Sequence, residues 1–286
     1  MMIDEHRHVG YTRANGTRTA EEIIAEMDRL GVDRAVIAPS GMKNEPQVSD
    51  EEEVAGQRKL MEAVRECIEG GRVTPEIEER RRGLVDHEDV LAAVRRYPER
   101  LIGCWWVNPW RGEEDCLSAA AAVRELGFRC VKLHPLVHVF AADDAVMSRV
   151  MEWAAEIDVP VWFHSSYGPG TEVRRIARLA ARFPGTRVIL GHAGVRDLAG
   201  EEHSREAAAA ARASRNVWID LSDCHEEPMR RMIENAPGDR LVLASDDPFG
   251  RLERQVSYLR EIAGEDSELF RMISGGNASA LLGVSA

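Results

Sequence analysis

The sequence has few of the features that mark a membrane protein, a secreted protein or a disulfide-stabilised domain. No apolar run approaches the ~20 residues that a bilayer-spanning helix needs. The N-terminus reads as a strand and lacks the pattern of a signal peptide. The five cysteines are odd in number and form no CxxC pair, so neither a disulfide framework nor a cysteine zinc site is expected. Reduced thiols favour a cytoplasmic protein.

Basic residues are outnumbered by acidic ones, 37 to 49. The formal net charge is -12, and no cluster of lysine and arginine interrupts the acidic surface. Such a surface repels phosphate backbones and anionic membranes, so neither nucleic acid nor a membrane is an expected partner. The 286 residues, 44% of them hydrophobic, are enough for a large core and close to the ~250 residues of a typical (β/α)8 barrel.

Short apolar runs alternate with longer segments of helical periodicity. Most of these runs stay apolar almost to their last residue, which is typical of parallel strands buried on both faces. Eight strands are predicted, namely Met2–Val9, Arg34–Ser40, Leu101–Pro109, Arg129–Pro135, Pro160–Ser166, Arg187–Gly194, Asn216–Asp223 and Arg240–Phe249. Eight strand–helix units predict an α/β protein with a (β/α)8 TIM barrel. A doubly wound sheet is the alternative, but no glycine-rich phosphate loop follows the first strand.

One connection is much longer than the others. Residues 41–85 follow the second predicted strand and contain a helical stretch near 52–69 and a second helix that starts at Thr74-Pro75. Because the active site of a barrel lies at the carboxyl ends of its strands, this insertion is expected on the active face of a single domain spanning residues 1–286. It could be a lid or pocket wall, or equally a surface decoration or dimer contact, and a homodimer stays open.

The first strand carries a histidine pair. His6 and His8 are two residues apart, so both imidazoles face one side of a strand while Arg7 faces the other. Two neutral imidazoles held close together are a ready chelate for a divalent metal. Because such histidine pairs are common in sequences, the pair alone is weak evidence for a metal site, and the places of the other candidate ligands must support the prediction.

Three further predicted strands end in a residue that can bind a metal. The residues are His164, His192 and Asp246, each preceded by three residues of strand-like sequence. A lone buried histidine is usually a hydrogen-bonded core residue. Five such side chains at the same end of one barrel instead favour a shared cation, which would satisfy all of them together.

Four strings of the sequence resemble those of the amidohydrolase superfamily, in the same order along the chain. They are Met2–His8 (MIDEHRH), Val131–Pro135 (VKLHP), Gly191–Gly194 (GHAG) and Ser245–Phe249 (SDDPF). They are most similar to the branch of aminocarboxymuconate semialdehyde decarboxylase and related metal-dependent hydrolases. The resemblance covers nearly the whole chain and implies a metal-dependent enzyme, but these motifs do not specify a substrate.

The resemblance also implies a role for each matching residue. His6, His8, His164 and Asp246 would bind one divalent metal, and His192 would be a ligand or a catalytic residue beside it. Asp246 would also accept a proton from metal-bound water, whose pKa falls to about 7. Zinc is the first choice for a histidine-rich site, with manganese and iron as alternatives.

Four other residues are candidates for contacts with the metal ligands or with the substrate. Lys132 lies where binuclear relatives hold a carboxylated lysine between two metals, but mononuclear relatives carry the same string, and pairing with a nearby acid is the alternative. His134 faces the same way and could touch substrate, orient a ligand or be a hydrogen-bonded rim residue. Trp105 and Trp106 end the third strand, so one indole, taken as Trp105, should face the barrel mouth. Arg196 could hold a carboxylate or be a solvated loop residue.

Three functions fit these residues. The leading one is hydrolysis of a small amide, ester or lactone by metal-activated water. The second is non-oxidative decarboxylation of an unsaturated or aromatic acid, which could use the same ligands. The third is an inactive barrel that serves as a binding subunit, and the complete ligand set argues against it. The expected partner of the enzyme is a small-molecule substrate.

Overall fold

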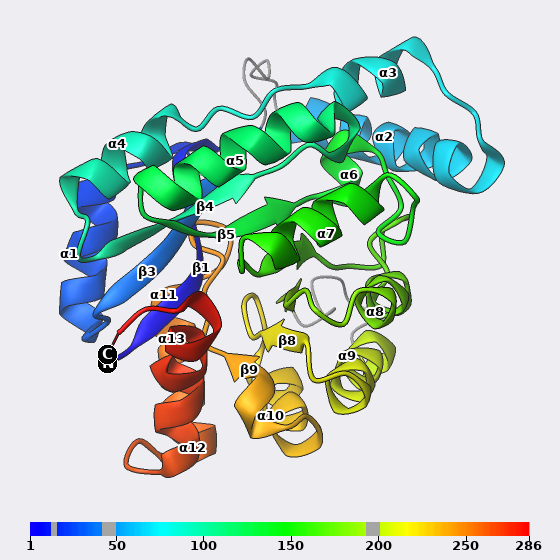
Figure 1. Cartoon of the computed structure of the whole chain (residues 1–286). Coiled ribbons are helices and arrows are strands. Elements are labelled where there is room, and N and C mark those ends of the chain that lie inside the picture. The colour runs from blue at the N-terminus through cyan, green and yellow to red at the C-terminus, as the bar shows by residue number, and fades with distance from the viewer. Residues whose placement is uncertain (13–15, 42–49, 193–200, 286) are drawn as a thin grey trace.

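A curled sheet of parallel strands forms the centre of the molecule (Figure 1). The computed structural model describes residues 1–12, 16–41, 50–192 and 201–285. Within these residues eight strands run parallel in the order β1-β3-β4-β5-β6-β7-β8-β9, and β2 pairs antiparallel with the end of β1. The strands are β1 (Ile3–Thr12), β2 (Gly16–Arg18), β3 (Arg34–Pro39), β4 (Leu101–Trp106), β5 (Phe128–Leu133), β6 (Val161–His164), β7 (Val188–Gly191), β8 (Val217–Asp220) and β9 (Leu241–Val242).

The two edges of the parallel sheet meet. The Glu5 amide donates to the Leu243 carbonyl at 2.9 Å, and the His8 amide donates to the Asp247 carbonyl at 2.8 Å. Arg7 and Asp247 form an isolated parallel bridge. These bonds join β1 to the segment after β9, so the prediction of an α/β TIM barrel is confirmed.

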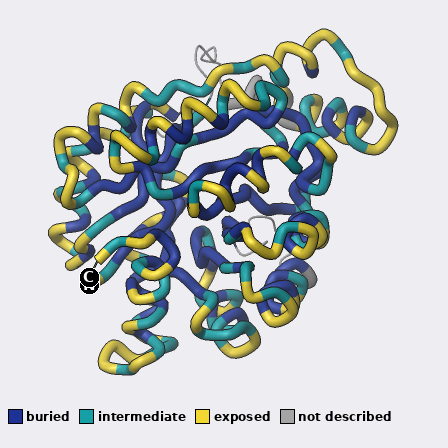
Figure 2. Tube along the Cα trace, in the orientation of Figure 1, coloured by how far each residue is buried: buried dark blue, intermediate teal, exposed yellow. Residues whose placement is uncertain are grey.

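Helices surround the sheet, and their outer faces are exposed while the strands are buried (Figure 2). The helices are α1 (Ala20–Leu30), α2 (Asp50–Gly70), α3 (Pro75–Arg82), α4 (Glu88–Arg96), α5 (Glu113–Glu125), α6 (Pro135–His138), α7 (Met147–Glu156), α8 (Val173–Arg182), α9 (Glu201–Ala213), α10 (Glu226–Asn235), α11 (Leu252–Leu259), α12 (Glu268–Arg271) and α13 (Asn277–Leu282). The larger apolar core lies between these helices and the strands. No helix in the described ranges has both the length and the apolar character that crossing a bilayer requires.

A second apolar core fills the inside of the barrel below the candidate site. It includes Ile3, Ile102 and Trp162 from the strands, together with Ala278 and Leu281 from α13. The helix α13 therefore closes one end of the barrel, and polar side chains that face inward from the strands collect toward the other end.

Most of the predicted strands extend too far at their carboxyl ends. The largest difference is at Arg240–Phe249, of which only Leu241–Val242 is a strand. Regular strand structure ends at Val242, although the segment that follows still bonds to β1, and Asp246 adopts a left-handed backbone with φ 58°. Apolar sequence alone does not distinguish a buried strand from the buried turn that follows it, because both exclude water.

The connection between β3 and β4 contains α2, α3 and α4. The predicted helices near 52–69 and from Thr74-Pro75 are present as α2 and α3. Thr74 caps α3, with its hydroxyl accepting from the Ile77 amide at 3.3 Å. In Figure 1, α2 and α3 extend beyond the ring of helices that surrounds the barrel.

Candidate functional site

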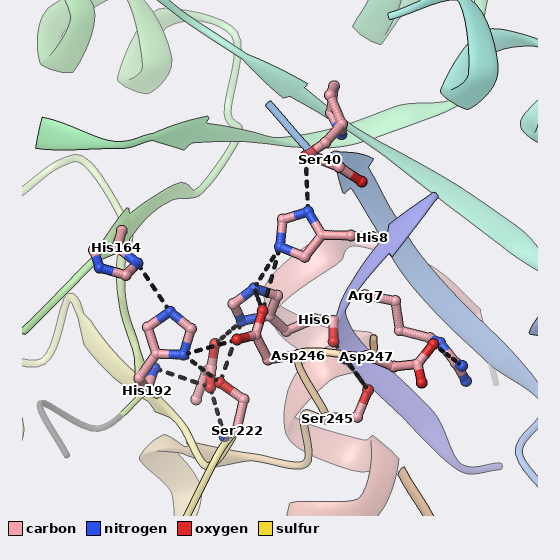
Figure 3. A network of polar contacts seen from close by, with 12 residues as sticks. His6, Arg7, His8, Ser40, His164, His192, Ser222, Ser245, Asp246 and Asp247 are labelled. Carbon is pink, nitrogen blue, oxygen red and sulfur yellow. Dashed lines mark hydrogen bonds and ion pairs between the residues drawn. The ribbon is translucent and has the colours of Figure 1, made fainter. Parts of the chain in front are cut away.

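Histidine and aspartate side chains from separate parts of the chain meet at one end of the barrel (Figure 3). His6 and His8 come from β1, and their Nε2 atoms lie 3.2 Å apart. The Oδ1 atom of Asp246, in the turn after β9, is 2.9 Å from His6 Nε2 and 3.3 Å from His8 Nε2. All three side chains are buried. The predicted convergence of these residues is therefore present in the structure.

The hydrogen bonds on the far side of each ring fix the tautomers of the pair. His6 Nδ1 donates to an Asp220 carboxylate oxygen at 2.7 Å, and His8 Nδ1 donates to the Pro39 carbonyl at 2.7 Å. In the neutral imidazoles both Nε2 atoms then carry lone pairs, and these face each other and the carboxylate of Asp246. Three acceptors at such distances repel one another unless a cation or an added proton lies among them, so this donor set fits a divalent metal.

His192 and His164 lie on the other side of Asp246 (Figure 3). His192 Nδ1 is 3.7 Å from Asp246 Oδ2 and 3.0 Å from Ser222 Oγ, while His192 Nε2 is 3.0 Å from His164 Nδ1. His6, His192 and Asp246 each offer one ligand atom, and these atoms lie within 4.8 Å of one another. The geometry therefore brings all five predicted ligand residues into one connected cluster, with His8 and His164 at its two sides.

Two residues of the cluster have unusual backbone conformations. His192 has φ 64° and Asp246 has φ 58°, in the left-handed region that few residues other than glycine adopt. His192 directly follows β7 and Asp246 lies in the turn after β9, so the positive φ turns the chain where the side chain must face the barrel axis. Strained conformations of this kind collect at functional sites.

Asp220, at the end of β8, belongs to the site although the sequence analysis did not select it. One carboxylate oxygen accepts from His6 Nδ1, and the other accepts from the amides of His192 and Ser222 at 3.2 and 2.7 Å. It thereby holds two members of the cluster in place. The signal was available, because Val217–Asp220 has the same apolar-then-polar pattern as the strands that end in His164 and His192.

Electrostatics keep the two aspartates ionised. Burial raises the pKa of Asp220, but His6 and His192 together with hydrogen bonds from His6 and Ser222 outweigh it and lower this pKa to about 2. Burial opposes ionisation of Asp246 as well, yet the same two histidines hold its pKa well below the ordinary value. Burial lowers the pKa of His8, against the attraction of Asp246. Neutral imidazoles and ionised carboxylates are the forms that bind metals.

A pocket of about 410 Å³ opens above the cluster. Its polar lining comes from His8, Ser40, Lys132, His134, His164, Ser166, His192 and Asp246, and its apolar lining from Leu60, Met61, Trp106, Leu136, Val137 and Phe249, with Gly41 at the edge. Leu60 and Met61 belong to α2. Of the residues predicted to contact the metal ligands or the substrate, Lys132 and His134 line this pocket, and Arg196 lies outside the described residues.

Stacked rings form one wall of the pocket. The His134 ring stacks on the His164 ring, with 3.9 Å between their centroids and an interplanar angle of 11°. It also stacks on the Trp106 ring, with 5.5 Å between centroids and an interplanar angle of 12°. Trp106 takes the position that was predicted for Trp105. Neighbouring residues on a strand face opposite ways, and Trp105 points outward, where it stacks on His87 at 3.8 Å.

A comparison with known protein families shows which family the chain belongs to. The sequence model of the family described as Amidohydrolase matches residues 3–284. The chain belongs to the amidohydrolase family. This match confirms the predicted superfamily and the prediction of an enzyme, and a divalent metal agrees with both the family and the donor cluster. No curated protein matches this amidohydrolase in sequence.

Solved structures similar to this amidohydrolase include decarboxylases and a hydrolase. One is a 5-carboxyvanillate decarboxylase from Novosphingobium aromaticivorans complexed with manganese and 4-hydroxy-3-methoxy-5-nitrobenzoic acid, with a TM-score of 0.66 and 16% identity over 99% of this chain and 96% of that chain. Another is a 2,6-dihydroxybenzoate decarboxylase from Rhizobium, with a TM-score of 0.65 and 13% identity over 99% of this chain and 98% of that chain. A third is a probable 2-pyrone-4,6-dicarboxylic acid hydrolase from Acinetobacter baumannii with citric acid bound, with a TM-score of 0.66 and 14% identity over 99% of both chains. At these identities the likeness establishes the fold.

Proposed function

We propose that this amidohydrolase is a metal-dependent, non-oxidative decarboxylase of a small aromatic carboxylic acid. The observation that supports this function best is the flat wall of Trp106, His134 and His164 directly beside the donor cluster. Aromatic faces stack favourably on a planar ring, and the apolar side chains of Leu136 and Phe249 exclude water from it. Two of the three similar structures named above are decarboxylases of hydroxylated aromatic acids. The leading prediction from the sequence, hydrolysis, thus becomes the second candidate.

Non-oxidative decarboxylation replaces a carbon–carboxylate bond with a carbon–hydrogen bond. The site must hold the ring, supply one proton to the ring carbon and release CO2. Asp246 and His192, with 3.7 Å between Oδ2 and Nδ1, are the groups at the floor of the pocket that would pass this proton from solvent to the ring carbon. Ser222 donates to or accepts from His192 Nδ1 and fixes the orientation of that ring.

The residues proposed as metal ligands are His6, His8, His164, His192 and Asp246. A divalent metal held there would supply positive charge that binds the oxygen substituents of the substrate. The histidine-rich donor set favours zinc, whereas the similar 5-carboxyvanillate decarboxylase is complexed with manganese. Elemental analysis of the purified protein distinguishes the two.

Hydrolysis of a lactone is the second candidate, and one observation supports it. Asp246 lines the pocket and its pKa is held well below its ordinary value, so this carboxylate is ionised at neutral pH and can accept a proton from water. The similar probable 2-pyrone-4,6-dicarboxylic acid hydrolase shares the fold.

We also propose that the 41–85 segment forms part of the pocket wall. Leu60 and Met61 of α2 line the same pocket as His8 and Asp246, which supports a place on the active face. A change in these side chains is then expected to alter substrate affinity without altering metal content.

The test of the function is product analysis with the manganese-loaded enzyme. Samples of 2,6-dihydroxybenzoate, 5-carboxyvanillate and 2-pyrone-4,6-dicarboxylate are incubated separately in D2O and in ¹⁸O-water. The proposal predicts release of CO2 from an aromatic acid, with one deuterium on the ring carbon and no ¹⁸O in the organic product. Incorporation of ¹⁸O into a ring-opened acid, without CO2, would establish the hydrolase and refute the decarboxylase.

A further inference from the structure

Lys132 is a buried cation whose hydrogen-bonding capacity is unused. The residue is 1% exposed and lines the pocket, and its Nζ atom lies 3.3 Å from the ring centroid of Trp162. No residue in the described ranges accepts a hydrogen bond from this ammonium group or forms an ion pair with it. An ammonium group has three donors, and the indole face satisfies its charge but not its directional hydrogen bonds. A buried donor without an acceptor is costly, so the group is poised for a ligand.

The sheet places this ammonium group at the base of the substrate pocket. In the register of the strands Lys132 pairs with Trp106 on one side and Trp162 on the other, and all three side chains face the inside of the barrel. Trp106 belongs to the stacked wall that we propose for the aromatic ring. Among the described residues that line the pocket, Lys132 is the only lysine or arginine.

The nearby carboxylates are occupied elsewhere or do not reach Lys132. Asp220 is held by His6 and by two backbone amides, and Asp246 faces the histidine cluster. Glu5 interacts with Lys132 electrostatically, but both of its carboxyl oxygens lack a hydrogen-bond partner. Burial lowers the pKa of Lys132 to about 8, with Asp246 and Asp220 opposing the shift, so the charged form still predominates at neutral pH.

We propose that Lys132 binds the carboxylate of the substrate and determines the preference of the site for an acid over its decarboxylated analogue. This inference rests on the proposed function, because it takes the ligand to be an aromatic acid. An ammonium–carboxylate hydrogen bond in a water-excluded pocket is among the stronger polar contacts. The carboxylate would lie over the ammonium group while the ring stacks on the wall that includes Trp106.

The test measures binding by rapid mixing, before turnover consumes the acid. Manganese-loaded wild type and Lys132→Met are titrated with 2,6-dihydroxybenzoate and with resorcinol, which differ only in the carboxylate. Methionine keeps an unbranched side chain of similar length but has no charge. The matched control is Arg129→Met, which removes a cation from the same strand, where the guanidinium bonds to the Val123 and Phe128 carbonyls.

The expected result is a loss of about 10- to 100-fold in affinity for 2,6-dihydroxybenzoate in Lys132→Met, with resorcinol affinity unchanged within about twofold. Arg129→Met should resemble the wild type with both ligands. Equal losses for the two ligands, or a wild type that does not prefer the acid, would overturn the proposal. A loss of manganese in Lys132→Met would assign the lysine to the metal centre and overturn it too. If the inference holds but no CO2 is released from any acid, the decarboxylase proposal alone fails.

Discussion

Replacement of Asp220 by asparagine tests how the metal cluster is oriented. One carboxylate oxygen of Asp220 accepts a hydrogen bond from His6 Nδ1, and the other accepts hydrogen bonds from the amides of His192 and Ser222. Asparagine has a single oxygen, so it cannot accept the hydrogen bonds from both His6 and the two amides. If that oxygen stays on the two amides, its NH2 group faces His6 Nδ1, and the neutral ring must then carry its proton on Nε2, where it cannot bind a metal.

The magnitude follows from the two possible orientations of the amide. Turning the oxygen toward His6 would leave two buried backbone amides unpaired, at about 1–3 kcal/mol each, so the orientation that disables His6 is favoured. Loss of a partner that orients a ligand histidine typically costs about 10- to 100-fold in metal affinity. We therefore expect Asp220→Asn to weaken metal binding by that factor while the protein remains folded.

The assay is a titration of metal-free protein with manganese or zinc in the presence of a competing chelator. Circular dichroism confirms that the variant is folded. The control is Asp239→Asn, an exposed aspartate that pairs with Arg240 at 2.9 Å far from the cluster, and it should bind metal as the wild type does. Wild-type metal affinity in a folded Asp220→Asn variant would refute the argument that Asp220 fixes the tautomer of His6.

Four further outcomes are expected. Asp246→Asn should retain metal through its remaining oxygen yet lose about 10²–10⁴-fold in turnover, measured by elemental analysis and kinetics. Trp106→Leu should raise KM for the aromatic acid about 3- to 10-fold, whereas Trp105→Leu should leave it unchanged. Met61→Ala should raise KM at constant metal content. An unchanged KM would show that α2 does not contribute to substrate binding. Burial lowers the pKa of His138 from 6.5 to about 3, so at low pH the unfolded state binds a proton that the folded state excludes. The fall in the free energy of unfolding between pH 7 and 5, measured in urea, should be about 2 kcal/mol smaller in His138→Gln than in the wild type.

The sequence alone predicts the barrel because its information is local and repeated. Each parallel strand is buried on both faces and therefore reads as a short apolar run, and each helix reads as a periodic segment. The same locality explains why His6 and His8 can be assigned to one face, since strand side chains alternate with a period of two. The positions of His164 and His192 at strand ends follow from that same pattern, whereas Asp246 lies in the turn after β9.

Contacts between strands cannot be read in this way. Side chains of β4 alternate between the two faces of the sheet. The packing of the whole sheet sets which face each side chain takes, and therefore whether Trp105 or Trp106 faces the pocket. A register shift between Asp4 and Arg7 lets Glu5 lie near Lys132 and Asp220 while His6 also faces the barrel axis. Strict alternation does not predict that arrangement.

The sequence by itself therefore determined the fold class, the family and the residues available to a metal, because each of these is expressed in short segments with a fixed period or a fixed string. Tertiary structure alone decided the hydrogen bonds that fix the His6 and His8 tautomers, the role of Asp220 and the exposure of the Lys132 ammonium group to the pocket. These depend on distances between atoms that lie up to 214 residues apart in the chain, and only the closing of the barrel brings such atoms to within a few ångströms of each other.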